Sequence, residues 1–302
     1  MEHKLMDLKT DFSFKQVFGQ PRSADILLAF LNAVLNRQGE DRIQSVSFVN
    51  SEIAPDHKFG KGKRLDVYVH TGRGERINIE IQLEREPAMG KRALLYWASL
   101  FDAQLFVGKG YDQLQQAISI NIVNSVMNSS TTRYHTSYHV REDQEGFILT
   151  DALEMLMIEL PKFRRDRSHR LSEAARDPFE RWLLLLDASK NETIRRELEE
   201  IAMTDTTMEH ALSLWEEISR DPDNYAAYLS RRKAMLDEIS HTQSAERRGL
   251  EKGIEKGIEK GIEKGKREVA KALLDEGESP ERVMNLTGLS LTEIESLKQD
   301  KK

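Results

Sequence analysis

The chain of 302 residues contains no cysteine. Disulfide bonds, zinc–thiolate clusters and cysteine nucleophiles are therefore excluded, and a reducing compartment is the simplest setting for such a sequence. The first residues lack the apolar segment of a signal peptide, and no later run approaches the length of a membrane span. We expect a cytoplasmic protein that has no membrane partner.

A surplus of positive charge is also missing, because 45 lysine and arginine residues are outnumbered by 51 aspartate and glutamate residues. The net charge of the whole molecule therefore gives no sign of nucleic-acid binding, although a local patch can still provide it. One such patch lies in residues 58–65, which contain no acid and hold Lys58, Lys61, Lys63 and Arg64.

Two common site motifs are absent. The stretch Gly60-Lys61-Gly62-Lys63 lacks both the glycine spacing of a phosphate-binding loop and the Ser or Thr that follows its lysine. An ATP-driven machine is therefore not indicated. His135 and His139 are four residues apart, but their segment is predicted to be a strand, which argues against a helical zinc pair.

Two acids lie inside segments that alternate between apolar and polar residues. Asp66 belongs to residues 65–69 and Glu80 to residues 77–83, and both segments show the period of two that indicates a half-buried strand. The glycine-rich residues between them predict a hairpin. A hairpin centred near Arg73 pairs residues whose numbers sum to 146, which places Asp66 directly opposite Glu80.

Facing acids repel each other unless a positive charge lies between them. Their Cβ atoms are expected roughly 5 Å apart, a separation that suits a hard divalent cation with oxygen ligands. The pair therefore predicts a metal site. The alternative is that both acids lie on a solvated face of the sheet, where carboxylates are ordinary.

The predicted helices and strands alternate through the first half of the chain, which indicates an α/β protein with a mixed sheet flanked by helices. The predicted elements are a helix at residues 22–37, a strand at 43–53, the hairpin, a long helix at 89–107, and strands at 117–126, 134–140 and 153–160. The buried side of the long helix is predicted to carry Leu94, Leu95, Ala98, Phe101 and Leu105. After Pro161 the sequence shows helical periodicity only.

Asp66, Glu80 and Gln82, with a helix before them and a long helix after them, resemble the active site of the PD-(D/E)XK nuclease superfamily. The segment Asp11–Gly19, the Glu80-Ile81-Gln82 motif and residues 96–105 with Gly108 and Tyr111 resemble the recombination-promoting nucleases, also called PD-(D/E)XK family transposases. This resemblance covers most of residues 7–245, and the tail rich in lysine, glutamate and glycine is also typical of the family.

The resemblance implies a restriction-endonuclease-like core that hydrolyses DNA phosphodiester bonds with Mg²⁺ or Mn²⁺ and is linked to recombination or a mobile element. Asp66, Glu80 and Gln82 would be the catalytic residues, and the metal ligands would be Asp66, Glu80 and the backbone carbonyl of Ile81. Gln82 departs from the usual lysine and supplies no positive charge. Arg64-Leu65 likewise replaces the proline expected before Asp66.

Several other residues are candidates for supporting roles or for contacts to DNA. Asp11 and Lys15 either lie near the site or simply stabilise the start of a helix. Lys61, Lys63 and Arg64 belong to the basic patch. Tyr96, with Lys91 and Arg92, either lines the DNA cleft or lies on a polar outer face. A second basic cluster either contacts phosphates or forms a solvated linker, and it contains Arg164, Arg165, Arg167 and Arg170.

Four copies of a tetrapeptide, glycine–aliphatic–glutamate–lysine, occupy residues 249–264. The period of four places Leu250, Ile254, Ile258 and Ile262 in a drifting stripe along a charged helix, which is either a spacer or a self-association segment. The tail after it has the outline of a helix-turn-helix. Acids at Glu293 and Glu295, in its would-be recognition helix, favour a contact to protein over a contact to DNA.

We expect a nuclease-like domain at residues 1–165, a helical region at 166–248, the repeat at 249–266 and a small helical tail at 267–302. The favoured function is a metal-dependent DNA endonuclease of low sequence specificity, because base-reading elements were not found. A dimer would provide the two sites needed for double-strand cutting. The alternative is a weak or inactive nuclease fold that acts as a self-associating interaction protein.

Overall fold

The computed structural model describes residues 4–49, 52–53, 63–83, 88–105, 110–167 and 175–299. The chain divides into two compact units, Met1–Arg232 and Lys233–Lys302. None of the helices in these described residues combines the length and apolar character that a membrane span requires.

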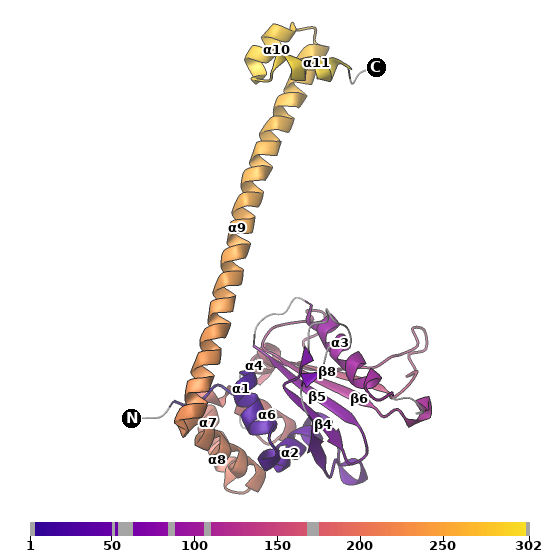
Figure 1. Cartoon of the computed structure of the whole chain (residues 1–302), viewed down its shortest axis with the longest axis vertical. Coiled ribbons are helices and arrows are strands. Elements are labelled where there is room, and N and C mark those ends of the chain that lie inside the picture. Colours follow the sequence, from indigo (N-terminus) through magenta and orange to yellow (C-terminus); the bar gives the residue numbers. More distant parts are fainter. Residues whose placement is uncertain are drawn as a thin grey trace. The chain divides into compact units, whose positions relative to one another are not determined.

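A six-stranded mixed sheet forms the centre of the first unit (Figure 1). Its strands, in spatial order, are β1 (Val46–Phe48), β4 (Val67–Thr71), β5 (Arg76–Gln82), β6 (Ala117–Val123), β8 (Leu153–Glu159) and β7 (His135–Tyr138). β5, β6 and β8 run parallel, whereas β1, β4 and β7 are antiparallel to their neighbours. A separate pair joins β2 (Glu52–Ile53) to β3 (Lys63–Arg64).

The hairpin register predicted from the sequence is confirmed. Val67 pairs with Ile79 and Val69 with Ile77, so the paired numbers sum to 146. β4 begins only at Val67, which places Asp66 in the bend before the strand rather than inside it. The predicted parallel interior strand is also confirmed, because β6 lies beside β5 in parallel register.

Helices cover both faces of the sheet, so the predicted α/β class is confirmed. The α-helices in the described residues are α1 (Asp11–Phe18), α2 (Ala24–Val34), α3 (Met89–Asp102), α4 (Leu160–Arg167), α6 (Pro178–Asp187), α7 (Glu192–Ala202), α8 (Thr206–Arg220), α9 (Pro222–Asp275), α10 (Pro280–Thr287) and α11 (Leu291–Gln299). The larger core lies between one sheet face and α1, α2, α6 and α8.

Apolar side chains of alternate strand residues fill that larger core. Ile77, Ile79 and Ile81 of β5 point into it, together with aromatic rings from α1, α2, α4, α6 and α8. The ring centroids of Phe30 and Trp182 lie 6.2 Å apart in an edge-to-face arrangement, a geometry that aromatic pairs favour. Helices after residue 178 therefore share one core with the sheet, and the predicted boundary at residue 165 falls inside α4.

The opposite face of the sheet is covered by α3, but not through the predicted side of that helix. Leu94, Leu95 and Leu105 are exposed, whereas Ala93 and Leu100 are buried. Trp97 sets the rotation of the helix, because its indole N–H donates to the carbonyl of Ala117 at 2.9 Å. Burying the large Trp97 ring with its hydrogen bond stabilises the helix more on this partly polar sheet face than burying the leucines would.

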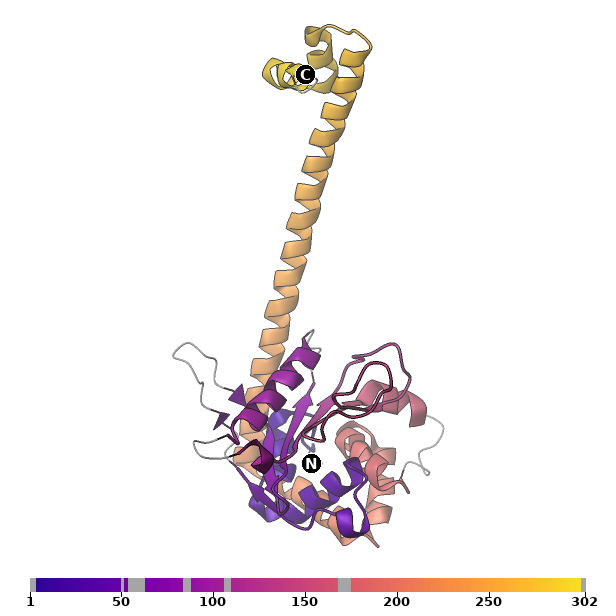
Figure 2. The same cartoon turned by 90° about the vertical axis from the view of Figure 1, so that its right-hand side faces the viewer.

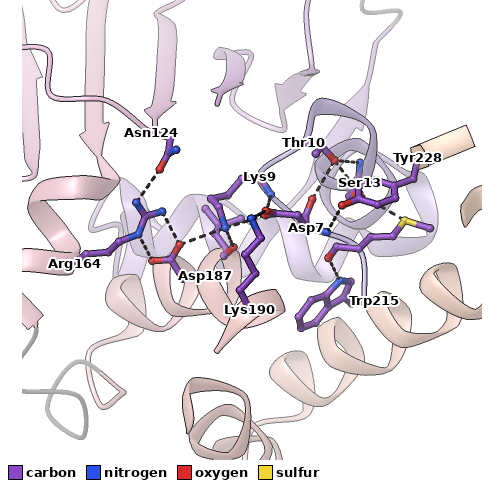
Figure 3. Close-up of polar contacts among 12 residues, drawn as sticks. Asp7, Lys9, Thr10, Ser13, Asn124, Arg164, Asp187, Lys190, Trp215 and Tyr228 are labelled. Carbon is purple, nitrogen blue, oxygen red and sulfur yellow. Dashed lines mark hydrogen bonds and ion pairs between the residues drawn. The ribbon is translucent and has the colours of Figure 1, made fainter. Parts of the chain in front are cut away.

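The segment before α1 is held by a buried polar network, which Figure 3 shows. The Lys9 ammonium lies 2.8 Å from Asp7, 3.4 Å from Asp187 and 2.9 Å from the carbonyl of Leu186. Arg164 binds both carboxylate oxygens of Asp187. This network fixes the entry of the chain into α1, whose first turn is capped by the side chain of Thr10.

Arg164 therefore differs from both expectations for the second basic cluster. Its guanidinium bonds to Asp187 at 2.7 and 2.8 Å and to Asn124 at 2.8 Å, so it is part of the scaffold. A bidentate arginine–carboxylate pair of this kind is a strong, directional contact. The side chain of Arg167 and the whole of Arg170 lie outside the described residues.

The second unit has a small core of its own, in which α10 and α11 pack against the last turns of α9 (Figure 2). Ala270, Val283, Leu289 and Ile294 are its buried members. Gly288 ends α10 with a left-handed backbone, at a φ of 68°. The tail thus contains the two short helices and the turn of the predicted helix-turn-helix outline.

The tetrapeptide repeat is helical throughout, as predicted, and forms part of α9. Its four aliphatic side chains, Leu250, Ile254, Ile258 and Ile262, are 55–65% exposed. Space beside the repeat glycines is open, because a Cβ atom built on any of them meets no heavy atom within 4 Å.

Candidate active site

Asp66 and Glu80 lie together at the end of the hairpin formed by β4 and β5. The backbone N–H of Asp66 donates to Oε1 of Glu80 at 3.3 Å, and Oδ2 of Asp66 accepts from the N–H of Ile81 at 2.8 Å. These reciprocal contacts follow from the cross-strand register, which continues from the Val67–Ile79 pair.

Glu80 is buried, with only 4% of its surface exposed, so the alternative of two acids on a solvated sheet face is wrong for this residue. Its neighbour Asn78 is fully buried and donates to Oε1 of Glu80 at 3.3 Å. Oδ1 of Asn78 and Oδ1 of Asn121 are buried without a hydrogen-bond partner in the described part of the chain. Asn121 pairs with Glu80 in the parallel register of β5 and β6.

Burial shifts the protonation of both acids in the same direction. It raises the pKa of Asp66 to about 6, and the charge of Asp11 adds to this rise. It raises the pKa of Glu80 to about 8, and the charge of Asp66 adds to that rise. Two coupled acids in a poorly solvated place cannot both be ionised without a compensating cation.

The carbonyl of Ile81 lies on the β4 side of its strand. Successive residues of a strand direct their backbone groups to opposite edges. The carbonyl of Gln82 points toward β6, where it accepts from the N–H of Asn124 at 2.9 Å, whereas the N–H of Ile81 points to Asp66. The Ile81 carbonyl therefore faces β4 and Asp66.

Two charged residues of α1, Asp11 and Lys15, act on the Asp66 carboxyl; their supporting role stays a prediction. The charge of Asp11 raises the pKa of Asp66, and the charge of Lys15 lowers it. Asp11 also lies 3.6 Å from the guanidinium of Arg231 on α9. The N-terminal helix therefore adds an acid and a base to the electrostatics of the site.

Arg92 on α3 reaches the sheet beside the two acids. Its guanidinium lies 3.9 Å from Oε2 of Glu80 and 3.5 Å from Oε1 of Gln82, and its Nε donates to the Tyr96 hydroxyl at 3.2 Å. Arg92 thus connects Tyr96 to Gln82. The sequence indicated Arg92 only as a residue that either lines the cleft or lies on a polar outer face.

The side chains of the basic patch before β4 lie outside the described residues. Lys61 lies outside the described residues, as do the side chains of Lys63 and Arg64, whose backbone forms β3. Their predicted contacts to DNA therefore stay predictions.

Sequence reasoning missed the polar residues that surround Glu80 on the buried sheet face. Asn121 and Ser119 alternate with isoleucines in β6, and a second buried pair joins Glu159 to Lys162 at 2.6 Å. The signal was present, because polar residues at every second position of an apolar interior strand share one face. That signal becomes informative only once the partner strand of β6 is known.

The donor atoms present here fit a hard divalent cation. The two carboxylates lie together, and the Ile81 carbonyl lies on the same side of its strand as its N–H, which donates to Asp66; all are oxygen ligands of the type that Mg²⁺ prefers. The described residues contain no cluster of three or more histidine, aspartate or glutamate side chains able to hold a metal ion. Mg²⁺ commonly binds one or two carboxylates and completes its shell with water and substrate phosphate, so two acids suffice.

A mixed sheet with helices on both faces and two coupled carboxylates on its hairpin defines the restriction-endonuclease-like class of nuclease folds. The family model of the PD-(D/E)XK nuclease family transposases matches residues 8–245, and the chain belongs to this family. Membership supports a nuclease that is linked to transposition and acts on DNA, in a family of enzymes that generally use divalent metals. No curated protein and no solved structure matches the chain.

Proposed function

We propose that this protein is a Mg²⁺-dependent DNA endonuclease of low sequence specificity, and that Mn²⁺ can replace Mg²⁺. The observation that carries the proposal is the pair of coupled, poorly solvated carboxylates, Asp66 and Glu80, beside a backbone carbonyl. Such a pair is unstable as two charges unless a cation joins it, and perturbed acids of this kind cluster at functional sites.

In this proposal Asp66, Glu80 and the carbonyl of Ile81 hold the metal ion. When bound, the ion supplies a nucleophilic water at neutral pH and offsets negative charge on the phosphate. Gln82 holds a water through its amide group, because an uncharged amide can donate and accept hydrogen bonds. Asn78 fixes the Glu80 carboxylate by the hydrogen bond at 3.3 Å.

Low sequence specificity follows from the kind of contacts that the chain offers. The basic side chains proposed to reach DNA, such as Arg92 and Lys15, surround the acids rather than forming a separate module for reading bases. Contacts of this kind go mainly to phosphates, which carry no sequence information. We expect strong salt dependence of DNA binding for the same reason.

A nicking assay on supercoiled plasmid tests the proposal. The wild-type protein should nick the plasmid with Mg²⁺ or Mn²⁺ and not with EDTA. Asp66→Asn and Glu80→Gln keep the shape of the side chains and should each reduce nicking at least ~100-fold, since each removes a ligand charge. Glu192→Gln, on an exposed acid of α7, is the matched control and should nick normally.

Binding of Mn²⁺ to the protein without DNA provides a second measurement. Titration calorimetry should show one site in the wild type and in Glu192→Gln, and a large loss of affinity in Asp66→Asn. Cleavage that persists in both acid variants, or a wild-type protein that neither nicks DNA nor binds Mn²⁺, would refute the proposed enzyme.

A second function is favoured by a separate observation, the exposed aliphatic stripe of the tetrapeptide repeat. We propose that this stripe joins copies of the chain, which would supply two nuclease sites for cutting both strands. If the Gln82 site proves inactive, self-association would be the main role of the protein. The tail helices α10 and α11 are proposed to contact protein, because Glu293 and Glu295 are unsuited to reading bases.

A further inference from the structure

Arg92 is held at the active site by contacts to three side chains from two elements. Its guanidinium lies 3.9 Å from Oε2 of Glu80 and donates to Oε1 of Gln82 at 3.5 Å. On its own helix, Nε donates to the hydroxyl of Tyr96 at 3.2 Å, and the guanidinium carbon lies 5.3 Å from the centroid of the Tyr96 ring. The side chain is 34% exposed, so part of the planar group faces the solvent from which DNA would approach.

The position of Arg92 matters because Gln82 brings no charge to a site that contains two acids. Among the described residues, the charge of Arg92 acts on both Asp66 and Glu80, whereas that of Lys15 acts on Asp66. A DNA phosphate adds further negative charge at this place. A cation close to the phosphate would stabilise this charge in addition to any metal ion.

Arginine is well suited to that task. Its guanidinium stays charged at every pH at which a protein is folded, and its planar fork of N–H groups matches two oxygens of a phosphate. Gln82 accepts from one side of the fork and Tyr96 from another, so these two residues orient the group without neutralising it. Oε2 of Glu80 lies 3.9 Å away, beyond the range of a direct hydrogen bond, so it does not occupy the N–H groups of the fork.

We propose that Arg92 is a catalytic residue that binds the nonbridging oxygens of the scissile phosphate, and that Gln82 and Tyr96 are its positioning residues. This inference rests on the proposed endonuclease function. In the step, a water oxygen bonds to phosphorus while one phosphorus–oxygen ester bond breaks and leaves its electron pair on the departing sugar oxygen. The water loses a proton to solvent and the departing oxygen takes one up, while Arg92 stays protonated and stabilises the charge on the phosphoryl oxygens.

Steady-state cleavage of a short DNA duplex by the full-length chain tests the proposal. Arg92→Met should lower kcat about 100-fold, the usual effect of removing one group that stabilises transition-state charge, with a smaller change in KM. Arg92→Lys keeps the charge but loses the fork, so it should recover part of kcat. Arg196→Met removes an exposed arginine of α7 and should leave kcat unchanged.

Measurements that do not depend on cleavage distinguish the proposed catalytic role of Arg92 from a purely structural role. Arg92→Met should keep the thermal midpoint within a few degrees of wild type and should bind Mn²⁺ without DNA at least as tightly, because a cation near the ligands is gone. Affinity for uncleaved DNA in Ca²⁺ should fall several-fold. Unchanged kcat in Arg92→Met, or loss of Mn²⁺ binding together with kcat, would overturn the assignment. A wild-type protein that cuts no DNA would instead overturn the endonuclease itself.

Discussion

Glu80 shows at the scale of single residues how stability is given up for a chemical site. Its carboxylate is buried next to Asp66 and an amide, in a place where an apolar side chain or a glutamine would be easier to accommodate. Burial raises its pKa to about 8, so at neutral pH the protein without metal holds a proton there. A buried acid of this type is expected where function needs it, because replacing it by an uncharged residue would restore the stability that it costs.

The pH dependence of stability follows from this shift. A carboxylate whose pKa is higher in the folded state contributes stability that is complete below the unfolded value of 4.5 and is lost as the pH rises through about 8. In EDTA, wild-type protein should therefore lose stability between pH 5 and 8. Glu80→Gln should flatten this decline and gain on the order of 2 kcal/mol at pH 8, measured by urea unfolding at each pH.

Adding Mg²⁺ should reverse the order of stability between the wild type and Glu80→Gln. If Mg²⁺ binds the folded protein as proposed, the wild type should gain stability in proportion to the logarithm of the Mg²⁺ concentration. Glu80→Gln should gain little, because one ligand charge is missing. A parallel pH profile in the two proteins, with equal responses to Mg²⁺, would show that Glu80 is neither perturbed nor a ligand.

Asp66 and Glu80 were predictable from the sequence, whereas the place of Arg92 was not. The two acids follow from alternation and from a hairpin whose pairing is fixed by residue numbers. Arg92 reaches them only because α3 is rotated by Trp97, which turns Leu94 and Leu95 outward. Helical periodicity identified the helix and gave the wrong buried side, since the rotation depends on a hydrogen bond to β6.

At the scale of elements, the segment before α1 links the candidate active site to the helices that follow the sheet. Lys9 lies between Asp7 and Asp187 with 6% of its surface exposed, and Trp215 donates to the carbonyl of Met6 at 2.9 Å. α1 begins directly after this segment and brings Asp11 and Lys15 toward Asp66. The position of the site therefore depends on contacts to α6 and α8.

Lys9→Ala should destabilise the first unit by about 3–5 kcal/mol, because two buried acids lose the cation between them. Lys190 is the matched control, since it contacts Asp7 at 3.2 Å but its side chain is 69% exposed. Lys190→Ala should change stability by less than about 1 kcal/mol. Urea unfolding measures both, and equal effects would contradict the view that burial makes the Lys9 pairs important.

Two glycines of the second unit are expected to respond in opposite directions to alanine. Gly288 has a φ of 68°, so Gly288→Ala should lose about 1–2 kcal/mol through backbone strain. Gly253 lies inside α9 with open space around it, so Gly253→Ala should gain about 1 kcal/mol of helix stability. Thermal melts followed by circular dichroism test the pair, and a stabilising Gly288→Ala would contradict the left-handed turn.

At the scale of the whole molecule, the repeat in α9 has the pattern of a surface that pairs with a copy of itself. A period of four produces ridges in the order glycine, aliphatic, glutamate and lysine around the helix. The small glycines allow two backbones to approach closely, so the aliphatic ridge of one helix can pack over the glycine ridge of the other. Glutamate then flanks one edge of this contact and lysine the other.

The direction of pairing follows from those flanking charges. In a parallel pair the glutamate edge of one helix faces the lysine edge of its partner at both sides, whereas an antiparallel pair brings like charges together. We therefore predict a parallel dimer. Ile254→Ser combined with Ile258→Ser should shift the full-length chain toward monomer in sedimentation velocity, while Met203→Ser, on a residue 83% exposed outside the repeat, should not.

A thiol introduced into a chain without cysteine tests the orientation directly. In a parallel pair two copies of residue 249 lie side by side, whereas in an antiparallel pair each lies about 24 Å along the helix from its counterpart, near residue 265. Gly249→Cys alone should therefore form a disulfide-linked dimer under mild oxidation, and so should Gly265→Cys alone. Cross-linking that requires a mixture of the two variants would establish the antiparallel arrangement, and the absence of dimer in all three experiments would exclude the repeat as the contact.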